Sequence, residues 1–162
     1  MKILTIAIPS YNSMDYMRNC IESLLPGGED VEILIVDDGS KDDTPAIADE
    51  YQEKYPGIVR AIHQENGGHG EAVNAGLRNA TGFFYKVVDS DDWVDAESYQ
   101  KILAFLKEAM KEEEPLDMLL SNYVYEKVGA KHKKVIQYHS ILPENRYFGW
   151  DEIGHFHASQ NI

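Results

Sequence analysis

The chain is poor in cysteine and in basic residues, and it has no long apolar run. A single cysteine, Cys20, among 162 residues excludes an intramolecular disulfide and a zinc site built from cysteines. The 15 basic residues stand against 28 acidic ones, and a formal net charge of -13 disfavours nucleic acid as a partner. No run approaches the roughly 18 apolar residues of a membrane span, and residues 1–8 are too short and strand-like for a secretory signal. The composition predicts a soluble, intracellular chain without a transmembrane segment.

Two common phosphate-binding motifs are also absent. The sequence contains no G-x-x-x-x-G-K-[ST] loop. Gly68 and Gly70 could begin a G-x-G-x-x-G motif, but Val73 occupies the position of its third glycine. The first predicted strand-helix turn, where a dinucleotide motif belongs, has no glycine at all. A nucleotide would therefore need a metal ion or backbone amides to offset its phosphate charge.

The sequence does contain a regular alternation of apolar strand patterns and helical patterns. Strand-like runs cover 3–8, 31–40, 58–63 and 83–89, with the second running into polar residues. Helical patterns follow them, starting at Asn12 or Ser13, at Thr44, at His69 and at about Ala96. Strand and helix in repeated alternation predict an α/β fold, a Rossmann-type three-layer sandwich with a mostly parallel central sheet.

Local signals predict where several of these elements begin and end. Pro9 is expected to end the first strand, because proline cannot donate to a sheet ladder. Thr44, followed by Pro45, is expected to cap the second helix, and Asp95 is expected to cap the fourth. The third helix is expected to have a small-residue face made of Ala72, Val73, Gly76, Leu77 and Ala80.

Beyond Pro115 the alternation stops. Two strand-like runs, 117–127 and 133–140, predict a hairpin or an extension of the sheet, and a helix is expected from Trp150 to Phe156. With no repeat and no convincing linker, 1–162 is interpreted as a single domain. Because the last helical pattern resembles the start of another structural part, we expect the protein to continue past Ile162.

Polar, turn-forming residues follow each of the four predicted strands, at 9–12, 37–40, 66–70 and 89–92. In an open α/β sheet, ligands bind outside the carboxyl ends of the strands. The stretch 37–40 is explained equally well by an ordinary turn or by carboxylates that accept hydrogen bonds from a nucleobase or a sugar. The carboxylates within 89–92 repel one another unless a cation or hydrogen-bond donors share the site, which favours Mg²⁺ or Mn²⁺.

Four segments in this order, "AIPSYN", "ILIVDDGSKDDT", "ENGGHGEAVNAGLRNATG" and "VVDSDD", resemble the nucleotide-sugar half of glycosyltransferase family 2, which has the GT-A fold. The resemblance implies transfer of a sugar, with inversion, from a nucleotide diphosphate sugar to a hydroxyl of a saccharide or lipid-linked acceptor. It favours a UDP-linked donor and Mn²⁺ or Mg²⁺ as cofactor. It also implies cell-surface polysaccharide or glycan synthesis, in the cytoplasm or at the inner face of the membrane.

The resemblance assigns the nucleobase pocket to residues after the first two strands. Pro9 and Tyr11 are expected to line it, and Asp37 is expected to accept a hydrogen bond from the base. Asp38 is expected beside Asp37, within the same nucleotide-sugar site.

The resemblance assigns the sugar-diphosphate side of the site to residues after the third and fourth strands. Asn74 matches an Asn of the family, but Val73 stands where an Arg often precedes it, so Lys86 and His69 are the candidates for a contact with the diphosphate. The acidic residues follow the family's D-x-D element: Asp89 near the ribose, Asp91 as the direct metal ligand, and Asp89 and Asp92 as candidates for further ligands.

No residue matches the general base, which the family carries after its D-x-D element. The late acids are Glu144, Asp151 and Glu152, and none stands in a matching context. We therefore expect the base beyond Ile162, and the alternative is that a partner supplies it. A noncatalytic nucleotide-sugar-binding module, or a fragment lacking its general base, is the competing hypothesis for the chain as a whole.

Overall fold

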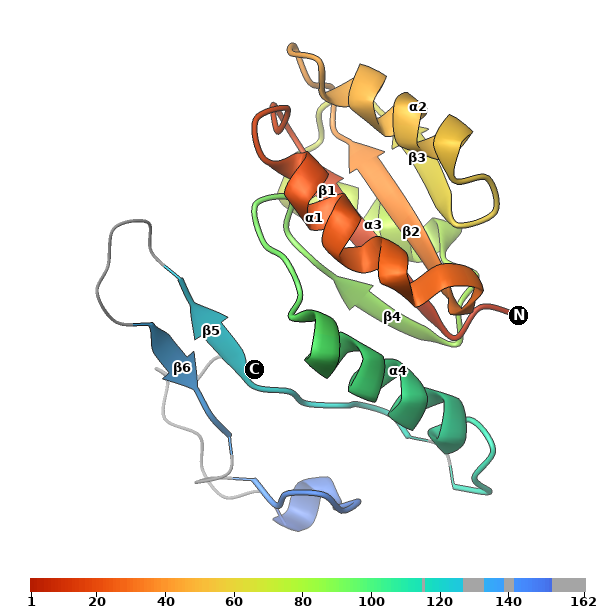
Figure 1. Cartoon of the computed structure of the whole chain (residues 1–162), viewed down its shortest axis with the longest axis vertical. Coiled ribbons are helices and arrows are strands. Elements are labelled where there is room, and N and C mark those ends of the chain that lie inside the picture. The colour runs from red at the N-terminus through yellow and green to blue at the C-terminus, as the bar shows by residue number, and fades with distance from the viewer. Residues whose placement is uncertain (115, 127–132, 139–141, 153–162) are drawn as a thin grey trace. The chain divides into compact units, whose positions relative to one another are not determined.

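The computed structural model describes residues 1–114, 116–126, 133–138 and 142–152. The chain divides into two compact units, Met1–Pro115 and Leu116–Ile162 (Figure 1). The single domain expected from the sequence stays a prediction.

A parallel four-stranded sheet forms the centre of the first unit. Its strands are β1 (Leu4–Ser10), β2 (Val31–Asp37), β3 (Val59–His63) and β4 (Phe84–Val87), in the order β3-β2-β1-β4. All residues of β1 and β2 are buried, as expected for central strands of a parallel sheet that is covered on both faces. The predicted α/β fold is confirmed.

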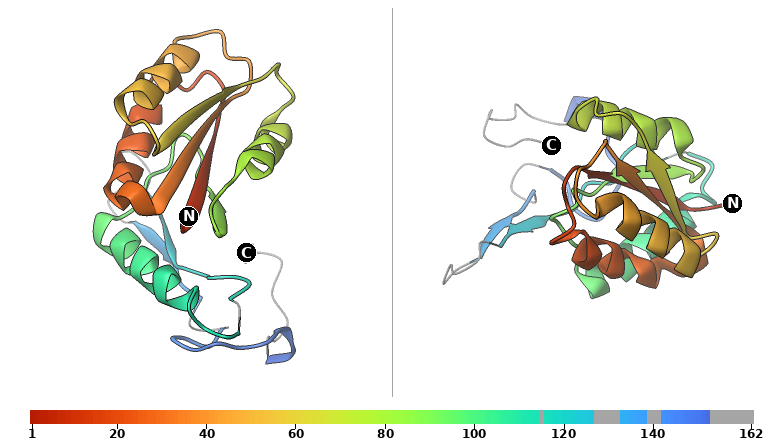
Figure 2. Two further views of the ribbon diagram at one scale, coloured as in Figure 1. Left: turned by 90° about the vertical axis from the view of Figure 1, so that its right-hand side faces the viewer. Right: turned by 90° about the horizontal axis from the view of Figure 1, so that it is seen from above.

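Helices cover both faces of this sheet. Figure 2 shows α1 (Met17–Leu24) and α2 (Thr44–Lys54) on one face and α3 (His69–Asn79) on the other. The short helix η1 (Leu25–Asp30) continues α1, and α4 (Ala96–Ala109) packs against it. The three layers match the predicted sandwich.

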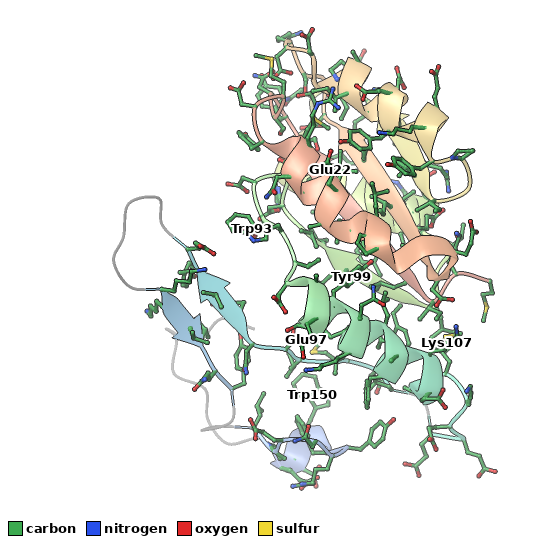
Figure 3. All side chains as sticks on the ribbon, viewed as in Figure 1. Glu22, Trp93, Glu97, Tyr99, Lys107 and Trp150 are labelled. Carbon is green, nitrogen blue, oxygen red and sulfur yellow. The ribbon has the colours of Figure 1, made fainter. Side chains whose placement is uncertain are left out.

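Tyr99 anchors α4 against the end of α1. Its ring is buried, and its hydroxyl donates a hydrogen bond of 3.2 Å to the carbonyl of Leu24 (Figure 3). Asp95 caps α4, because its carboxylate accepts from the backbone N–H of Ser98 at 2.9 Å. The predicted cap at Asp95 is confirmed.

The direction in which the chain adds strands to the sheet reverses between β1 and β4. From β1 the chain builds the sheet outward through β2 to β3, and α3 then returns it to β4 on the other side of β1. The loops leaving β1 and β4 therefore lie at neighbouring strand ends. In open α/β sheets this place is where ligands bind.

The expectation that Pro9 ends the first strand is wrong, because β1 continues to Ser10. The carbonyl of Ser10 accepts a hydrogen bond from the β2 side, and the carbonyl of Ala7 accepts one from the β4 side. Alternation along the strand directs the nitrogen of Pro9 toward the β4 side, where pairing has already ended at Ala7. The missing N–H of Pro9 therefore costs no ladder hydrogen bond.

The predicted start of the first helix and the predicted cap of the second are also corrected. The helix expected from Asn12 or Ser13 begins at Met17, because the carbonyl of Ser13 first closes a turn with the N–H groups of Tyr16 and Met17. Thr44 does not cap α2 with its side chain. Its hydroxyl instead accepts a hydrogen bond of 2.7 Å from the N–H of Ser13, which joins two loops.

The packed face of α3 is rotated from the predicted one. Ala72, Ala75 and Gly76 are buried, whereas Leu77 is 56% exposed. Gly76 fixes this rotation, since an added Cβ there would lie 2.6 Å from the Cβ of Ala7 in β1. The helix approaches the sheet this closely only where a side chain is missing.

The second unit contains two short strands, β5 (Tyr123–Tyr125) and β6 (Lys134–Ile136), which pair antiparallel in a sheet of their own. Of the two predicted possibilities, the pairing fits the hairpin; the connection at 127–132 lies outside the described residues. A 3-10 turn, η2, covers Trp150–Glu152, and the rest of the helix predicted to Phe156 also lies outside them. No helix within the described ranges is both long and apolar enough to cross a membrane.

Candidate functional site

Asp38 joins the end of β2 to the glycine loop, defined here as Gln64–Gly68. Its buried carboxylate accepts hydrogen bonds from the backbone N–H groups of Gly67 and Gly68, each at 2.8 Å, and from the Gln64 amide at 2.7 Å. Burial raises the pKa of Asp38, but these three donors lower it, and the net shift is downward. Asp38 therefore holds the glycine loop in place as an ionised carboxylate.

Gly39 allows the turn after β2 to touch the glycine loop. Its φ of +72° lies in the left-handed region, and an added Cβ would lie 2.8 Å from the backbone nitrogen of Asn66. Both the backbone angle and the close contact require glycine at this position.

Asp37 ends β2 and is almost fully buried. One carboxylate oxygen accepts from the N–H of Ser40 at 3.0 Å, and the other lies 3.1 Å from Nδ1 of His63. Nε2 of His63 lies 3.0 Å from a carboxylate oxygen of Asp49 on α2. Burial lowers the pKa of His63, but the hydrogen bonds to Asp37 and Asp49 raise it above its ordinary value.

The loop after β1 extends toward this turn. Asn12, at φ +51°, accepts from the N–H of Lys41 at 2.8 Å, and its own N–H donates to the hydroxyl of Ser40 at 3.0 Å. Pro9 is buried within β1, whereas Tyr11 is 49% exposed beyond the strand end. Of these two predicted pocket residues, only Tyr11 presents a ring to solvent.

The loops after β1 and β4 are joined where the strand order reverses. The hydroxyls of Ser13 and Ser90 lie 2.9 Å apart, and both side chains are buried. The N–H of Ser13 also donates to the hydroxyl of Thr44, so a single residue joins the loops after β1 and β4 to the start of α2.

The acidic loop, defined here as Asp89–Asp92, lies beside this junction and is exposed except at Ser90. The N–H of Asp92 donates to the carbonyl of Asp89, which closes a tight turn. Partial burial raises the pKa of the Asp92 carboxyl, the charges of Asp91 and Asp89 raise it further, and Lys86 opposes them. The loop therefore concentrates negative charge.

Cys20 lies beneath the acidic loop, with its thiol directed to the carbonyl of Asp89 at 3.6 Å. Burial, followed by the nearby carboxylates, raises its pKa to about 12. A thiol with this pKa stays protonated at neutral pH, so Cys20 belongs to the packing of α1 rather than to the chemistry of the site.

Of the predicted diphosphate candidates, Lys86 acts on the charge of Asp92, and His69 lies beside Asp89. It is the first residue of α3, and its Nε2 lies 3.8 Å from a carboxylate oxygen of Asp89. Asn74 is also exposed on α3, near Glu71, and the pKa of the Glu71 carboxyl is lowered first by Arg78 and then by Asn74.

The carboxylates of the acidic loop suit a divalent cation whose remaining ligands come from the phosphate groups of a bound molecule and from water. Within the described ranges, no group of three or more His, Cys, Asp or Glu side chains converges to hold a metal ion. Mg²⁺ and similar cations are commonly bound by one or two carboxylates together with phosphate oxygens and water. Asp91 and its crowded neighbours suit that arrangement better than a cage made of protein ligands alone.

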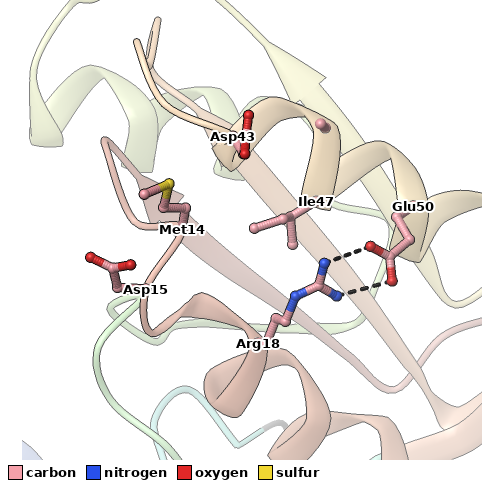
Figure 4. Close-up of a pocket in the computed structure, with 7 residues that line it drawn as sticks. Met14, Asp15, Arg18, Asp43, Ile47 and Glu50 are labelled. Atoms are coloured by element: carbon pink, nitrogen blue, oxygen red, sulfur yellow. Dashed lines mark hydrogen bonds and ion pairs between the residues drawn. The ribbon is translucent and has the colours of Figure 1, made fainter.

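An open pocket of about 460 Å³ lies elsewhere, between the loop before α1 and the start of α2 (Figure 4). None of the predicted site residues lines it. Its one cationic lining residue, Arg18, donates two hydrogen bonds to Glu50, at 2.9 and 2.6 Å, and lies over the ring of Tyr51. These contacts join α1 to α2, so we assign the pocket no ligand.

The sequence matches Glycosyl transferase family 2 over residues 5–156. The chain belongs to this family. The membership predicted from the four ordered segments is confirmed.

Individual proteins resemble two thirds or more of the chain. It is 36% identical to EpsH of Bacillus subtilis (strain 168) over 124 residues, which is 76% of this chain and 34% of EpsH. The crystal structure of S. aureus TarS 1–349 in complex with UDP-GlcNAc shares 34% identity with a TM-score of 0.59, over 68% of this chain and 32% of that one.

A second solved structure, of a mannosyltransferase, is similar over a shorter part. PcManGT from Pyrobaculum calidifontis, in complex with GDP-Man and Mn²⁺, shares 26% identity with a TM-score of 0.50, over 59% of this chain and 30% of that one. The chain thus spans about a third of the length of these relatives.

Of the late acids, Glu152 is held by neighbouring groups of its own segment. Glu152 accepts hydrogen bonds from Arg146 at 2.7 Å and from the N–H of Gly149 at 3.2 Å, and these lower its pKa. A carboxylate held this way is a weaker base than a free one.

Sequence reasoning missed His63, Ser13 and Ser90. His63 is 26 positions from Asp37 and Ser13 is 77 positions from Ser90, so local patterns carry no sign of these contacts. Aligning the second and third predicted strands side by side would have placed His63 next to Asp37.

Proposed function

We propose that the chain forms the donor-binding part of a glycosyltransferase that takes its sugar from a UDP-sugar, with Mn²⁺ or Mg²⁺ as cofactor. The observation that carries the proposal is that the loop of Tyr11 is joined both to the turn after Asp37 and to the acidic loop, at the reversal point of a family 2 sheet. UDP-GlcNAc in TarS supports the choice of donor, and Mn²⁺ in PcManGT supports the choice of cofactor.

The nucleobase would bind between Asp37 and Tyr11. Each carboxylate oxygen of Asp37 has one protein donor, so each keeps a lone pair that can accept from the N3–H of uracil. The exposed ring of Tyr11 can stack on the base. Asp38, whose carboxylate already has three donors, acts by holding the glycine loop rather than by contacting the base.

The sugar diphosphate would lie over the acidic loop. Asp91 would hold the cation, Asp89 and Asp92 are the candidates for a second ligand, and His69 is placed beside Asp89 for a contact with a phosphate oxygen. When bound, the cation would neutralise charge that develops on the departing nucleoside diphosphate. Ser90 fixes the loop against Ser13, so the carboxylates are held in position before the donor arrives.

Transfer with inversion also needs a base that deprotonates the acceptor hydroxyl from the opposite side of the sugar. We assign this role to no described residue. The chain by itself is therefore expected to bind the donor and to transfer its sugar poorly. The competing hypothesis, a noncatalytic nucleotide-sugar-binding module, predicts the same binding but no transfer in any longer form.

Calorimetric titration with UDP, with and without Mn²⁺, tests the donor site. We expect binding that Mn²⁺ strengthens, and a loss of about tenfold in affinity for Asp91→Asn only when Mn²⁺ is present. Asp15→Asn, the same charge change at an exposed residue outside the acidic loop, serves as the control. No binding of UDP would remove the donor assignment, and an equal loss without Mn²⁺ would remove the metal role of Asp91.

A turnover assay separates the enzyme from the binding module. UDP released from UDP-GlcNAc, or from another UDP-sugar, is measured for this chain and for a version extended past Ile162. Faster release by the extended version supports a transferase. The absence of any release by the extended version, despite UDP binding, favours the binding module.

A further inference from the structure

The ring of His63 is held between two carboxylates that belong to different layers of the fold. Nδ1 lies 3.1 Å from Asp37, at the end of the neighbouring strand β2, and Nε2 lies 3.0 Å from Asp49 on α2. Among the described residues, Asp37 and Asp49 are the charged groups that face the ring. Arg60, also on β3, contacts Glu32 instead, and Asp38 contacts the glycine loop.

Only the imidazolium form of His63 satisfies both neighbours. A neutral ring has one N–H, so whichever tautomer forms, its second nitrogen directs a lone pair at a carboxylate. Asp49 is 56% exposed and can be hydrated instead, whereas Asp37 is buried. The neutral ring is therefore expected to keep its N–H on Asp37 and to lose both the contact with Asp49 and the positive charge.

We propose that His63 is a positioning residue for the nucleotide pocket, which orients the Asp37 carboxylate and, when protonated, compensates its charge so that nucleotide binding depends on pH. The inference rests on the proposed function, because it takes Asp37 as the acceptor for the nucleobase. His63 itself need not touch the nucleotide, since its ring acts through the oxygen of Asp37 that it faces.

The direction of the pH dependence follows from desolvation. A bound base removes water from the Asp37 carboxylate, and this costs less when an imidazolium already pairs with that carboxylate. Burial lowers the pKa of His63, but Asp37 and Asp49 raise it by more. The imidazolium form that pairs with Asp37 therefore persists to a higher pH than in an ordinary histidine. UDP affinity is therefore highest below this pKa and falls as the pH rises through it.

The test combines an NMR titration of His63 with UDP affinities measured in Mg²⁺ from pH 5.5 to 8.5. In Asp49→Asn we expect the His63 midpoint to fall by about one pH unit, and the step in UDP affinity to fall with it. Glu53→Gln makes the same charge change at an exposed residue of α2 and should move neither. Because UDP also titrates in this range, the comparison is made between variants with the same ligand.

Two substitutions of His63 separate its charge from its hydrogen bond. His63→Asn keeps a donor for Asp37 without a titrating group, so it should remove the His63-dependent step and bind UDP at every pH as the unaltered chain does in its alkaline limit. His63→Ala loses the donor as well, and it should bind about fivefold more weakly than His63→Asn.

The outcomes distinguish this inference from the function on which it rests. If the unaltered chain binds UDP but Asp49→Asn leaves the affinity step in place, the inference is wrong and the donor site stands. If His63→Asn retains the full step, the inference is wrong as well. If the unaltered chain binds no UDP at any pH, the proposed function falls and the inference falls with it.

Discussion

The hydroxyls of Ser13 and Ser90 lie 2.9 Å apart and join the loops that leave β1 and β4. The residues are 77 positions apart in the chain, and they meet because β1 and β4 are neighbours in the sheet. This contact holds the acidic loop in a fixed relation to the loop that carries Tyr11.

A double-mutant cycle measures the worth of that contact. Ser13→Ala and Ser90→Ala should each lower the free energy of unfolding, because each leaves a buried hydroxyl without its partner. The coupling between them should be about 1 kcal/mol, as measured by chemical denaturation of both single variants and the double variant. Strictly additive effects would mean that the two hydroxyls do not stabilise one another.

Removing the Asp38 carboxylate should release the glycine loop. Asp38→Ala leaves the N–H groups of Gly67 and Gly68 without their acceptor, at a cost of about 2–3 kcal/mol in unfolding free energy. Hydrogen exchange at these two amides should become faster, whereas exchange in α4 changes only by the global loss of stability. Unchanged exchange at Gly67 and Gly68 would contradict the role assigned to Asp38.

Gly39 and Gly57 form a matched pair for testing the contact with the glycine loop. Both have positive φ, +72° and +81°, but an added Cβ meets Asn66 only at Gly39 and meets nothing within 4 Å at Gly57. Alanine at either position costs about 1–2 kcal/mol in backbone strain. Gly39→Ala should cost measurably more in thermal or chemical unfolding, and equal losses would exclude a steric role for the Asn66 contact.

Glu32 should make stability depend on pH in the acidic range. Its buried carboxylate accepts from Thr5, Thr81 and Arg60, and although burial raises its pKa, these donors bring it below the ordinary value. A carboxylate with a lowered folded-state pKa stabilises the protein above its unfolded pKa, and this stabilisation is lost as the pH falls through the folded value. Unfolding free energies measured from pH 7 to pH 3 should fall more steeply for the unaltered chain than for Glu32→Gln.

The ionised carboxylate of Asp92 should have the opposite effect on stability to that of Glu32. Burial and the charges of Asp91 and Asp89 raise its pKa in the folded chain, so its ionised form opposes folding at neutral pH. Asp92→Asn should therefore stabilise the free chain at pH 7 by a few tenths of a kcal/mol, a small gain because the carboxylate is exposed and screened. Glu53→Gln is the control, and a loss of stability in Asp92→Asn would mean that the carboxylate makes a favourable contact in the free chain.

The sequence was sufficient to predict the sheet, the order of the loops and the family. Apolar runs such as the one in β2 carry a strong signal, because a strand buried on both faces must be apolar throughout. The cap at Asp95 was also predictable, because its partner Ser98 lies only three positions away. The rotation of α3 was not, because the contact between Gly76 and Ala7 joins elements that are distant in sequence.

By itself, the sequence determined which side chains gather at the carboxyl edge of the sheet, because each strand delivers its following loop to that edge. Only the tertiary structure decided what each of them does there. Asp37 and Asp38 are identical neighbours in the chain, yet one pairs with His63 and the other holds the glycine loop. Successive residues at a strand end project in different directions, so their partners are set by packing between elements and not by local pattern.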